Sequence, residues 1–212
     1  MRKQLPAVTS IAVIASIAWL AGCAPSKVAA TLVLQMEEAT PEKIASAAQV
    51  LTERFKEVTP GSFASVTPTI SGHTLSFAFR GGAPTEISVR ALSTERAEFG
   101  IFSAENASDV WITDEDVVEA RLSTKAGGEF VSVHLKPEAG KRLADKTAAN
   151  VGKRLITTWD GNEVMSSQIQ APFGEDFEFT APSEQVGRVM QVTLGHGRLP
   201  IAIRSFDYRV AQ

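Results

Sequence analysis

The chain of 212 residues contains a single cysteine, Cys23, so no disulfide bond within the chain can hold its fold together. A thiolate zinc site is also excluded as its role, because the further cysteine ligands are missing. Cys23 follows Ile11–Ala21, an uncharged apolar run of eleven residues that is preceded by Arg2 and Lys3. This pattern is typical of a secretory signal segment and is too short to span a bilayer comfortably.

The four residues Leu20-Ala21-Gly22-Cys23 resemble the lipobox of bacterial lipoproteins. The resemblance implies that residues 1–22 are removed as a signal peptide and that the Cys23 sulfur carries diacylglycerol. Residues 23–30 would then be a lipidated tether that holds the protein at a membrane of the cell envelope, facing the periplasm. Ala24 stands where an Asp would favour the inner membrane, so the outer membrane is favoured if the cell has two. The alternative is an ordinary signal peptide whose removal leaves Cys23 as a free thiol.

The charge of the chain argues against nucleic acid as a partner. Without residues 1–22, the chain keeps 19 of its 21 basic residues and all 24 acidic ones, a formal charge of −5. A protein that neutralises phosphates needs an excess of Lys and Arg. The remaining 190 residues are enough to bury a sizeable core as one domain or two small ones.

Short strands and helices alternate along this part of the chain. The pattern predicts a first strand at Thr31–Met36, a helix that is capped by Thr40 and ends near Val58, and a hairpin over Phe63–Ile70 and His73–Arg80. Further hairpins and helices are expected after it, among them helices that begin at Pro137 and Pro182, and the chain should end as a polar tail after Ile203. Together these elements predict an α+β fold with mostly antiparallel sheets.

Five segments, in this order, resemble SecD, an accessory protein of the export channel. Trp111–Arg121 resembles its "L-T-G-x-D-x-x-x-A" segment, and Phe130–Ala144 its strand followed by the "G-A-x-x-F-A" helix. Thr147–Leu155 resembles "T-x-x-N-x-G-K-x-x-A", Trp159–Val164 resembles "L-D-G-x-V", and Gly195–Pro200 resembles "R-x-G-A-L-P". The N-terminal unit, which includes Leu51-Thr-Glu-Arg54, is similar to the base of the same periplasmic domain.

The resemblance implies the first periplasmic domain of SecDF, in which a ferredoxin-like β-α-β-β base carries a mixed α/β head. We expect the base at residues 31–106 and the head at residues 107–212, with the Gly81-Gly82 break as an alternative joint. In that family the head contacts exported polypeptide, and membrane helices use proton flow to drive movement. After Cys23 the sequence has no apolar segment of membrane length, so force generation by the chain alone is not expected.

The resemblance makes unfolded polypeptide or an export or envelope protein the expected partner, besides the membrane. Trp159, Phe173, Phe177 and Phe179 are the candidate binding residues, because unfolded chains bind to apolar pockets or to the edges of sheets. Alternatively, these aromatic side chains pack in the core. An envelope lipoprotein that uses the fold for structural contacts with one partner is the second hypothesis.

An enzyme is not expected, because the sequence has no nucleophile elbow, phosphate loop, dinucleotide fingerprint or catalytic-cysteine pattern. Metal binding is also not expected, because the three histidines are far apart in the sequence. The acidic run Asp114-Glu115-Asp116 is better explained as a solvated turn than as a cation loop. No cofactor is expected.

Overall fold

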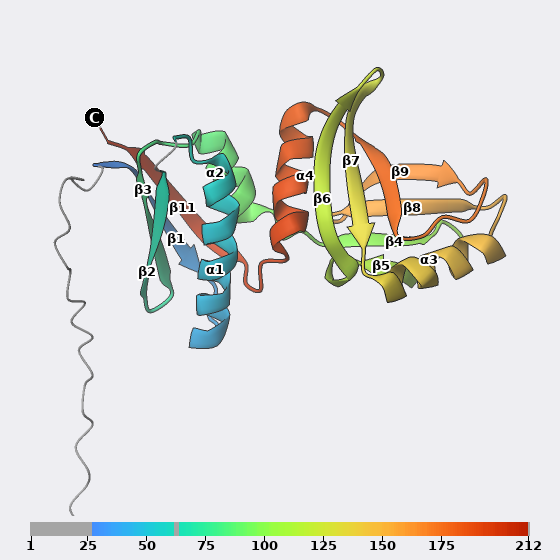
Figure 1. The fold of residues 1–212 in the computed structure, drawn as a ribbon. Coiled ribbons are helices and arrows are strands. Elements are labelled where there is room, and N and C mark those ends of the chain that lie inside the picture. The colour runs from blue at the N-terminus through green and yellow to red at the C-terminus, as the bar shows by residue number, and fades with distance from the viewer. Residues whose placement is uncertain (1–26, 62–63, 212) are drawn as a thin grey trace, which may run out of the picture.

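The computed structural model describes residues 27–61 and 64–211, which form two lobes, called the base and the head below (Figure 1). Residues 1–22 and Cys23, to which the signal-peptide and lipidation predictions refer, lie outside the described residues. None of the helices that the structure describes is long and apolar enough to cross a membrane.

The base consists of six elements that form one four-stranded sheet with two helices on one face. The elements are β1 (Val28–Met36), α1 (Pro41–Val58), β2 (Ser65–Ser71), β3 (Thr74–Arg80), α2 (Glu86–Thr94) and β11 (Ile203–Val210). The strand order is β11-β1-β3-β2 with every pair antiparallel. This β-α-β-β-α-β order is that of a ferredoxin-like unit. The predicted α+β class and ferredoxin-like base are therefore confirmed, and the head is an insertion between α2 and β11.

The core of the base forms where alternating apolar residues of the sheet meet the apolar face of α1. Leu32 and Leu34 point to the same face as Phe77 and Phe79, and all four are buried. The ring of Phe55 from α1 packs edge-on against Phe77 and Phe79, with centroids 5.0 and 5.5 Å apart. The predicted start of this helix is also confirmed, because the Thr40 hydroxyl accepts the Lys43 N–H and Pro41 is the first helical residue.

The head contains two antiparallel sheets that run across one another in Figure 1. One has the order β5-β4-β8-β9 and the other β10-β7-β6. The strands are β4 (Phe99–Ser103), β5 (Asn106–Thr113), β6 (Val117–Lys125), β7 (Gly128–Leu135), β8 (Arg154–Trp159), β9 (Asn162–Gln168) and β10 (Asp176–Ala181). The helices are α3 (Pro137–Ala149) and α4 (Glu184–His196), and a 3-10 turn covers Asp114–Asp116. Helix α3 packs on β5, and α4 packs on β6 and β7.

Two strands belong to a different lobe from the one expected with a boundary between residues 106 and 107. Strand β4, expected in the base, pairs with β5 and β8 of the head. Residues 203–210, expected as a polar tail, form β11 and pair with β1 from Ala30↔Val210 to Met36↔Ile203. Phe206 and Tyr208 of β11 face the helices of the base, where the Tyr208 hydroxyl donates to the Pro84 carbonyl at 2.6 Å. The expectation of a tail was wrong because these two side chains complete the core.

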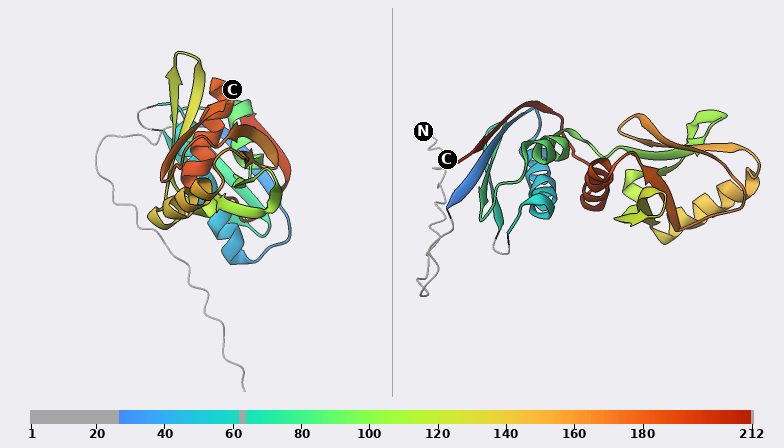
Figure 2. Two further views of the ribbon diagram at one scale, coloured as in Figure 1. Left: turned by 90° about the vertical axis from the view of Figure 1, so that its right-hand side faces the viewer. Right: turned by 90° about the horizontal axis from the view of Figure 1, so that it is seen from above.

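The lobes meet where α4 packs against α1 and α2 and where the chain crosses twice, at residues 95–98 and 197–202 (Figure 2). Arg54 of α1 lies fully buried at this joint. Its Nη1 donates to the carbonyls of Leu92 and Glu95 at 2.9 and 2.7 Å, and its Nη2 donates to the Gly197 carbonyl at 2.7 Å. Burial lowers the pKa of Arg54 to about 10, so the guanidinium stays charged at neutral pH. One side chain thus connects α1, the end of α2 and the end of α4.

We expect Arg54→Met to lower the free energy of unfolding by about 3 kcal/mol, because three carbonyl oxygens in or near the buried joint lose a charged donor. Urea denaturation followed by circular dichroism measures this change. Lys56→Met is the matched control on the same helix, because Lys56 forms only an exposed pair with Glu53 and its loss should change the stability by less than about 1 kcal/mol. Equal effects of the two variants would contradict this role for Arg54.

Candidate functional site

The structure separates the four predicted binding residues into two groups. Trp159 and Phe179 are buried, with 8% and 2% of their surface exposed. Phe173 and Phe177 are half-buried and pack against the edge of the same core. Only the second pair is therefore positioned to contact another molecule through a substantial part of its rings.

The rings of Phe173 and Phe177 are the outer end of an aromatic row that begins in the core. Phe173 and Phe177 have ring centroids 6.5 Å apart, and Phe177 stacks on the ring of Phe99 at 6.1 Å. Phe99 in turn stacks on Phe179 at 6.2 Å. Ring stacking of this kind stabilises more than burial alone. The buried members therefore hold Phe177 in place, and its outer side stays accessible.

A hollow of about 310 Å³ lies beside Phe173 and Phe177, between β9 and β10. Its walls come from β8, β9, the segment between β9 and β10, and β10 itself. The lining residues are Leu155, Met165, Ser167, Gln168, Ile169, Gln170, Ala171, Phe173, Phe177 and Glu178. The hollow thus combines apolar and aromatic side chains with uncharged polar groups, and Glu178 is its one carboxylate. We call it the β9/β10 hollow.

The two strands that flank this hollow are the outermost strands of their sheets. Strand β9 pairs only with β8 in the sheet β5-β4-β8-β9, and β10 pairs only with β7 in the sheet β10-β7-β6. The two strands approach each other, but the described pairings include none between them. Their outer backbone N–H and C=O groups are therefore free to pair with an added strand.

A second hollow, of about 580 Å³, covers the outer face of the three-stranded sheet, and Phe177 and Glu178 line both hollows. Its polar side chains bond to one another. Glu119 pairs with Arg121 at 2.6 Å, and His134 pairs with Asp176 at 2.8 Å. Glu178 accepts from Lys125 at 2.5 Å and from the Ser132 hydroxyl at 2.7 Å, and these bonds lower its pKa. Nowhere in residues 27–61 and 64–211 do three His, Cys, Asp or Glu side chains gather in a way that could hold a metal ion.

Helix α3 positions the segment that carries Phe173. The Thr147 hydroxyl donates to the Leu143 carbonyl at 2.7 Å and accepts the Phe173 N–H at 3.1 Å. Gly140 lies so close to the same segment that an added Cβ would be 2.2 Å from Cγ and 2.9 Å from Cα of Glu175. Two residues of the SecD-like segments thus support the β9/β10 hollow without lining it.

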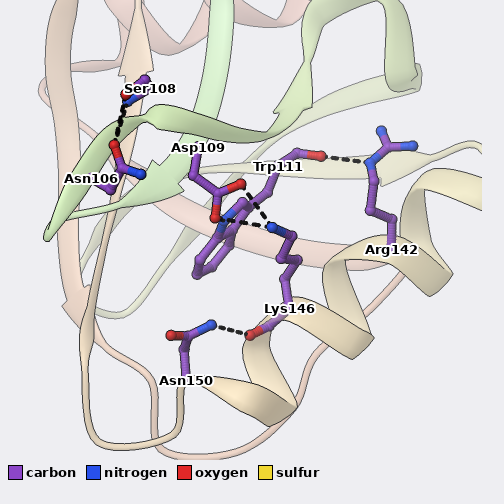
Figure 3. A network of polar contacts seen from close by, with 7 residues as sticks. All are labelled: Asn106, Ser108, Asp109, Trp111, Arg142, Lys146 and Asn150. Carbon is purple, nitrogen blue, oxygen red and sulfur yellow. Dashed lines mark hydrogen bonds and ion pairs between the residues drawn. The ribbon is translucent and has the colours of Figure 1, made fainter.

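A polar network holds α3 on β5 (Figure 3). The carboxylate of Asp109 accepts from the indole N–H of buried Trp111 at 2.8 Å and from Lys146 Nζ at 2.7 Å, and both bonds lower its pKa. Arg142 Nε donates to the Trp111 carbonyl at 2.7 Å, and its Nη2 pairs with Asp116 at 2.6 Å. The predicted acidic turn is therefore partly tied to α3 and is not simply solvated. The network fixes the helix that supports the hollow.

Comparison with known families identifies the head. Residues 90–201, more than half of the chain, match the family described as SecDF, P1 head subdomain. The chain belongs to this family. The match extends from the second half of α2 to the end of the head, so it includes both hollows and α3.

The chain spans only about a fifth of the length of the SecD relative that it matches. Protein translocase subunit SecD of Thermobaculum terrenum is 33% identical over 95 residues, which is 43% of this chain and 18% of that protein. A crystal structure of SecDF in its super-membrane-facing form superposes with a TM-score of 0.67 at 18% identity, covering 85% of this chain and 30% of that one. A second structure, of SecDF described as a membrane component that enhances protein export, gives a TM-score of 0.62 at 20% identity, covering 82% of this chain and 96% of that one. The two structures establish that base and head share the fold of the SecDF periplasmic domain.

Sequence reasoning missed Met165 and Ile169, which line the hollow. The alternation in β8 and β9 predicts that these strands have two faces, but it does not say which face meets β10. It also missed Gly140 and Thr147 as supports of the Phe173 segment. The only available signal was their place in segments that resemble SecD.

We expect Gly140→Ala to lower the free energy of unfolding by about 1–3 kcal/mol, because the added methyl group forces Glu175 away from α3. Gly195→Ala is the matched control. It is also helical, an added Cβ there meets no atom within 4 Å, and the exchange should raise the stability by about 0.5–1 kcal/mol. Thermal and urea denaturation compare the variants. Stabilisation of both would show that the contact with Glu175 is not tight.

Proposed function

We propose that this chain is a lipid-anchored, non-enzymatic module of the cell envelope that binds polypeptide through its head and so assists protein export or folding. The β9/β10 hollow is the observation that carries the proposal. It combines two half-buried aromatic rings with two unpaired strand edges within a head of the SecDF P1 family. The relatives that match are a translocase subunit and SecDF, a membrane component that enhances protein export, which makes an exported chain the favoured ligand.

The chemistry of the hollow suits an extended segment of varied sequence. Backbone pairing along β10 or β9 does not depend on the side chains of the ligand, so it supplies affinity without selecting a sequence. The rings of Phe173 and Phe177 would take apolar side chains of that segment, and Gln168 and Gln170 could satisfy its polar ones. Such a site would hold many clients weakly.

A binding role without catalysis is supported by the state of the polar groups in the larger hollow. Glu119, His134 and Glu178 each have a charged partner on the same sheet. A general acid or base needs a pKa near the working pH, but the pKa of Glu178 is shifted further down. Glu178 is therefore poorly suited to proton transfer near neutral pH, and its bonds to Lys125 and Ser132 stabilise the sheet face.

Photocrosslinking in living cells tests the binding role. A photoreactive residue at position 173 or 178 should capture many newly exported chains, and the signal should disappear when export is blocked. Thr69, on the exposed outer face of β2 in the base, is the control position and should capture few. Capture of one discrete protein would instead support the alternative, in which the fold makes structural contacts with a specific envelope partner. No crosslinks from 173 or 178 above those from position 69 would overturn the proposal.

The anchor is tested separately, at Cys23. Only residues 24–27 separate this cysteine from β1, so a lipid on Cys23 would keep the base within about 20 Å of the membrane surface. We expect Cys23→Ser to abolish labelling by a radioactive or clickable fatty acid and to leave the precursor uncleaved at this site. Fractionation of the wild type should place it in a membrane, with the outer membrane favoured. Normal maturation of the variant would contradict lipidation.

A further inference from the structure

The sheet of the base has two outer strands, β2 and β11, whose free edges differ. They stand at the two ends of the order β11-β1-β3-β2, and the pairings described for the chain include none beyond them. An unpaired edge presents backbone N–H and C=O groups that can pair with another strand, so proteins usually protect it with proline or with charged side chains. The two edges of the base are protected to different degrees.

Pro68 protects the free edge of β2, where it stands opposite Phe77 of β3. The His73 carbonyl accepts the Met36 N–H at 2.9 Å and so faces β1. The backbone groups of a strand alternate between its two sides, so Phe77 also faces β1, and its partner Pro68 faces away from β3. Because proline has no N–H, this edge lacks a donor at its centre.

The free edge of β11 has no such interruption. The Ala211 N–H donates to the Ala29 carbonyl at 2.9 Å, so the odd-numbered residues at this end of the strand turn their backbone groups toward β1. The backbone groups of Phe206, Tyr208 and Val210 therefore face outward. The N–H and C=O groups of these three residues are thus open to an added strand.

The side chains of β11 place apolar groups on one face of this edge and charges of opposite sign on the other. Phe206 and Tyr208 lie half-buried on the face that carries the helices, and Val210, which follows them on that face, is 58% exposed. Asp207 and Arg209 lie on the other face with exposed side chains and pair with each other at 2.7 Å. The charges at this edge therefore alternate in sign and do not form a run of like charges.

This pattern is complementary to itself in one antiparallel register. When the Tyr208 residues of two copies stand opposite each other, Asp207 of each copy faces Arg209 of the other, and Phe206 faces Val210. Both ion pairs then occupy positions without backbone hydrogen bonds, where side chains on neighbouring strands are closest. A register centred on residue 207 or 209 instead places like charges opposite each other, which is destabilising. Only the register centred on Tyr208 forms both ion pairs.

We propose that two copies of the chain associate through β11, antiparallel about Tyr208, so that their two four-stranded base sheets join into one continuous sheet. The two-fold axis is perpendicular to the sheet, so the helices of both copies lie on the same face. The exposed side chain of Val210 is then covered by Phe206 of the second copy. The contact uses no residue of the β9/β10 hollow, so the inference does not depend on the proposed polypeptide binding.

Charge reversal tests both the association and its register. Sedimentation equilibrium of the full-length chain in density-matched detergent measures the Kd of the dimer. Asp207→Arg and Arg209→Asp should each raise this Kd by about 10- to 100-fold, because both cross-strand pairs become like-charged. An equal mixture of the two variants should associate as tightly as the wild type, because each Arg again faces an Asp. Recovery in the mixture also shows that both variants are folded.

Glu119→Arg is the matched control. Glu119 forms an exposed pair with Arg121 at 2.6 Å, at the same spacing, on an outermost strand of the head, and its reversal should leave the Kd unchanged. Val210→Pro gives the β11 edge the protection that Pro68 gives to β2. It removes an outward N–H, so it should weaken the dimer and leave the circular dichroism spectrum unchanged.

Three results would overturn the dimer. The first is a wild type that stays monomeric at the highest concentration reached. The second is a mixture of Asp207→Arg and Arg209→Asp that associates no better than either variant alone, because the proposed register requires recovery. The third is a loss of association in Glu119→Arg but not in Asp207→Arg, which would place the contact on the head sheet.

Discussion

The pairing of β11 with β1 is the constraint on which the rest of the structure depends. It brings the last strand of the chain beside the first, with Leu32 opposite Tyr208 and Leu34 opposite Phe206, and so completes the core of the base. Once β11 is fixed there, the whole head must leave and return through the gap between α2 and β11. Arg54 lies where the two crossings meet, and its buried guanidinium donates to the Glu95 carbonyl of one crossing and the Gly197 carbonyl of the other.

The sequence predicted those elements whose signals are local. Thr40 and Pro41 mark the start of α1 because capping and φ preference act within one turn, and the alternation of Phe77 and Phe79 marks β3. Strand β11 was missed because its core-facing residues Ile203 and Phe206 are three residues apart, which breaks the period of two. The register shift opposite Gln35 and Met36 lets both side chains pack on the same core.

The candidate site was predicted in part, for a similar reason. The aromatic cluster pointed to the right region, but sequence alone could not say that Trp159 and Phe179 are buried while Phe173 and Phe177 are only half-buried. Which face of a strand is covered depends on how two sheets pack, and that is not encoded in the alternation itself.

The position of the head between α2 and β11 also has a consequence for how this fold can vary. In a ferredoxin-like unit, the last helix and the last strand are joined by an ordinary loop, and here about half of the chain occupies that loop. The sheet order β11-β1-β3-β2 uses no strand of the head. In terms of connectivity, the head is thus a replaceable insertion. The base can carry a differently shaped insertion between the same two crossings.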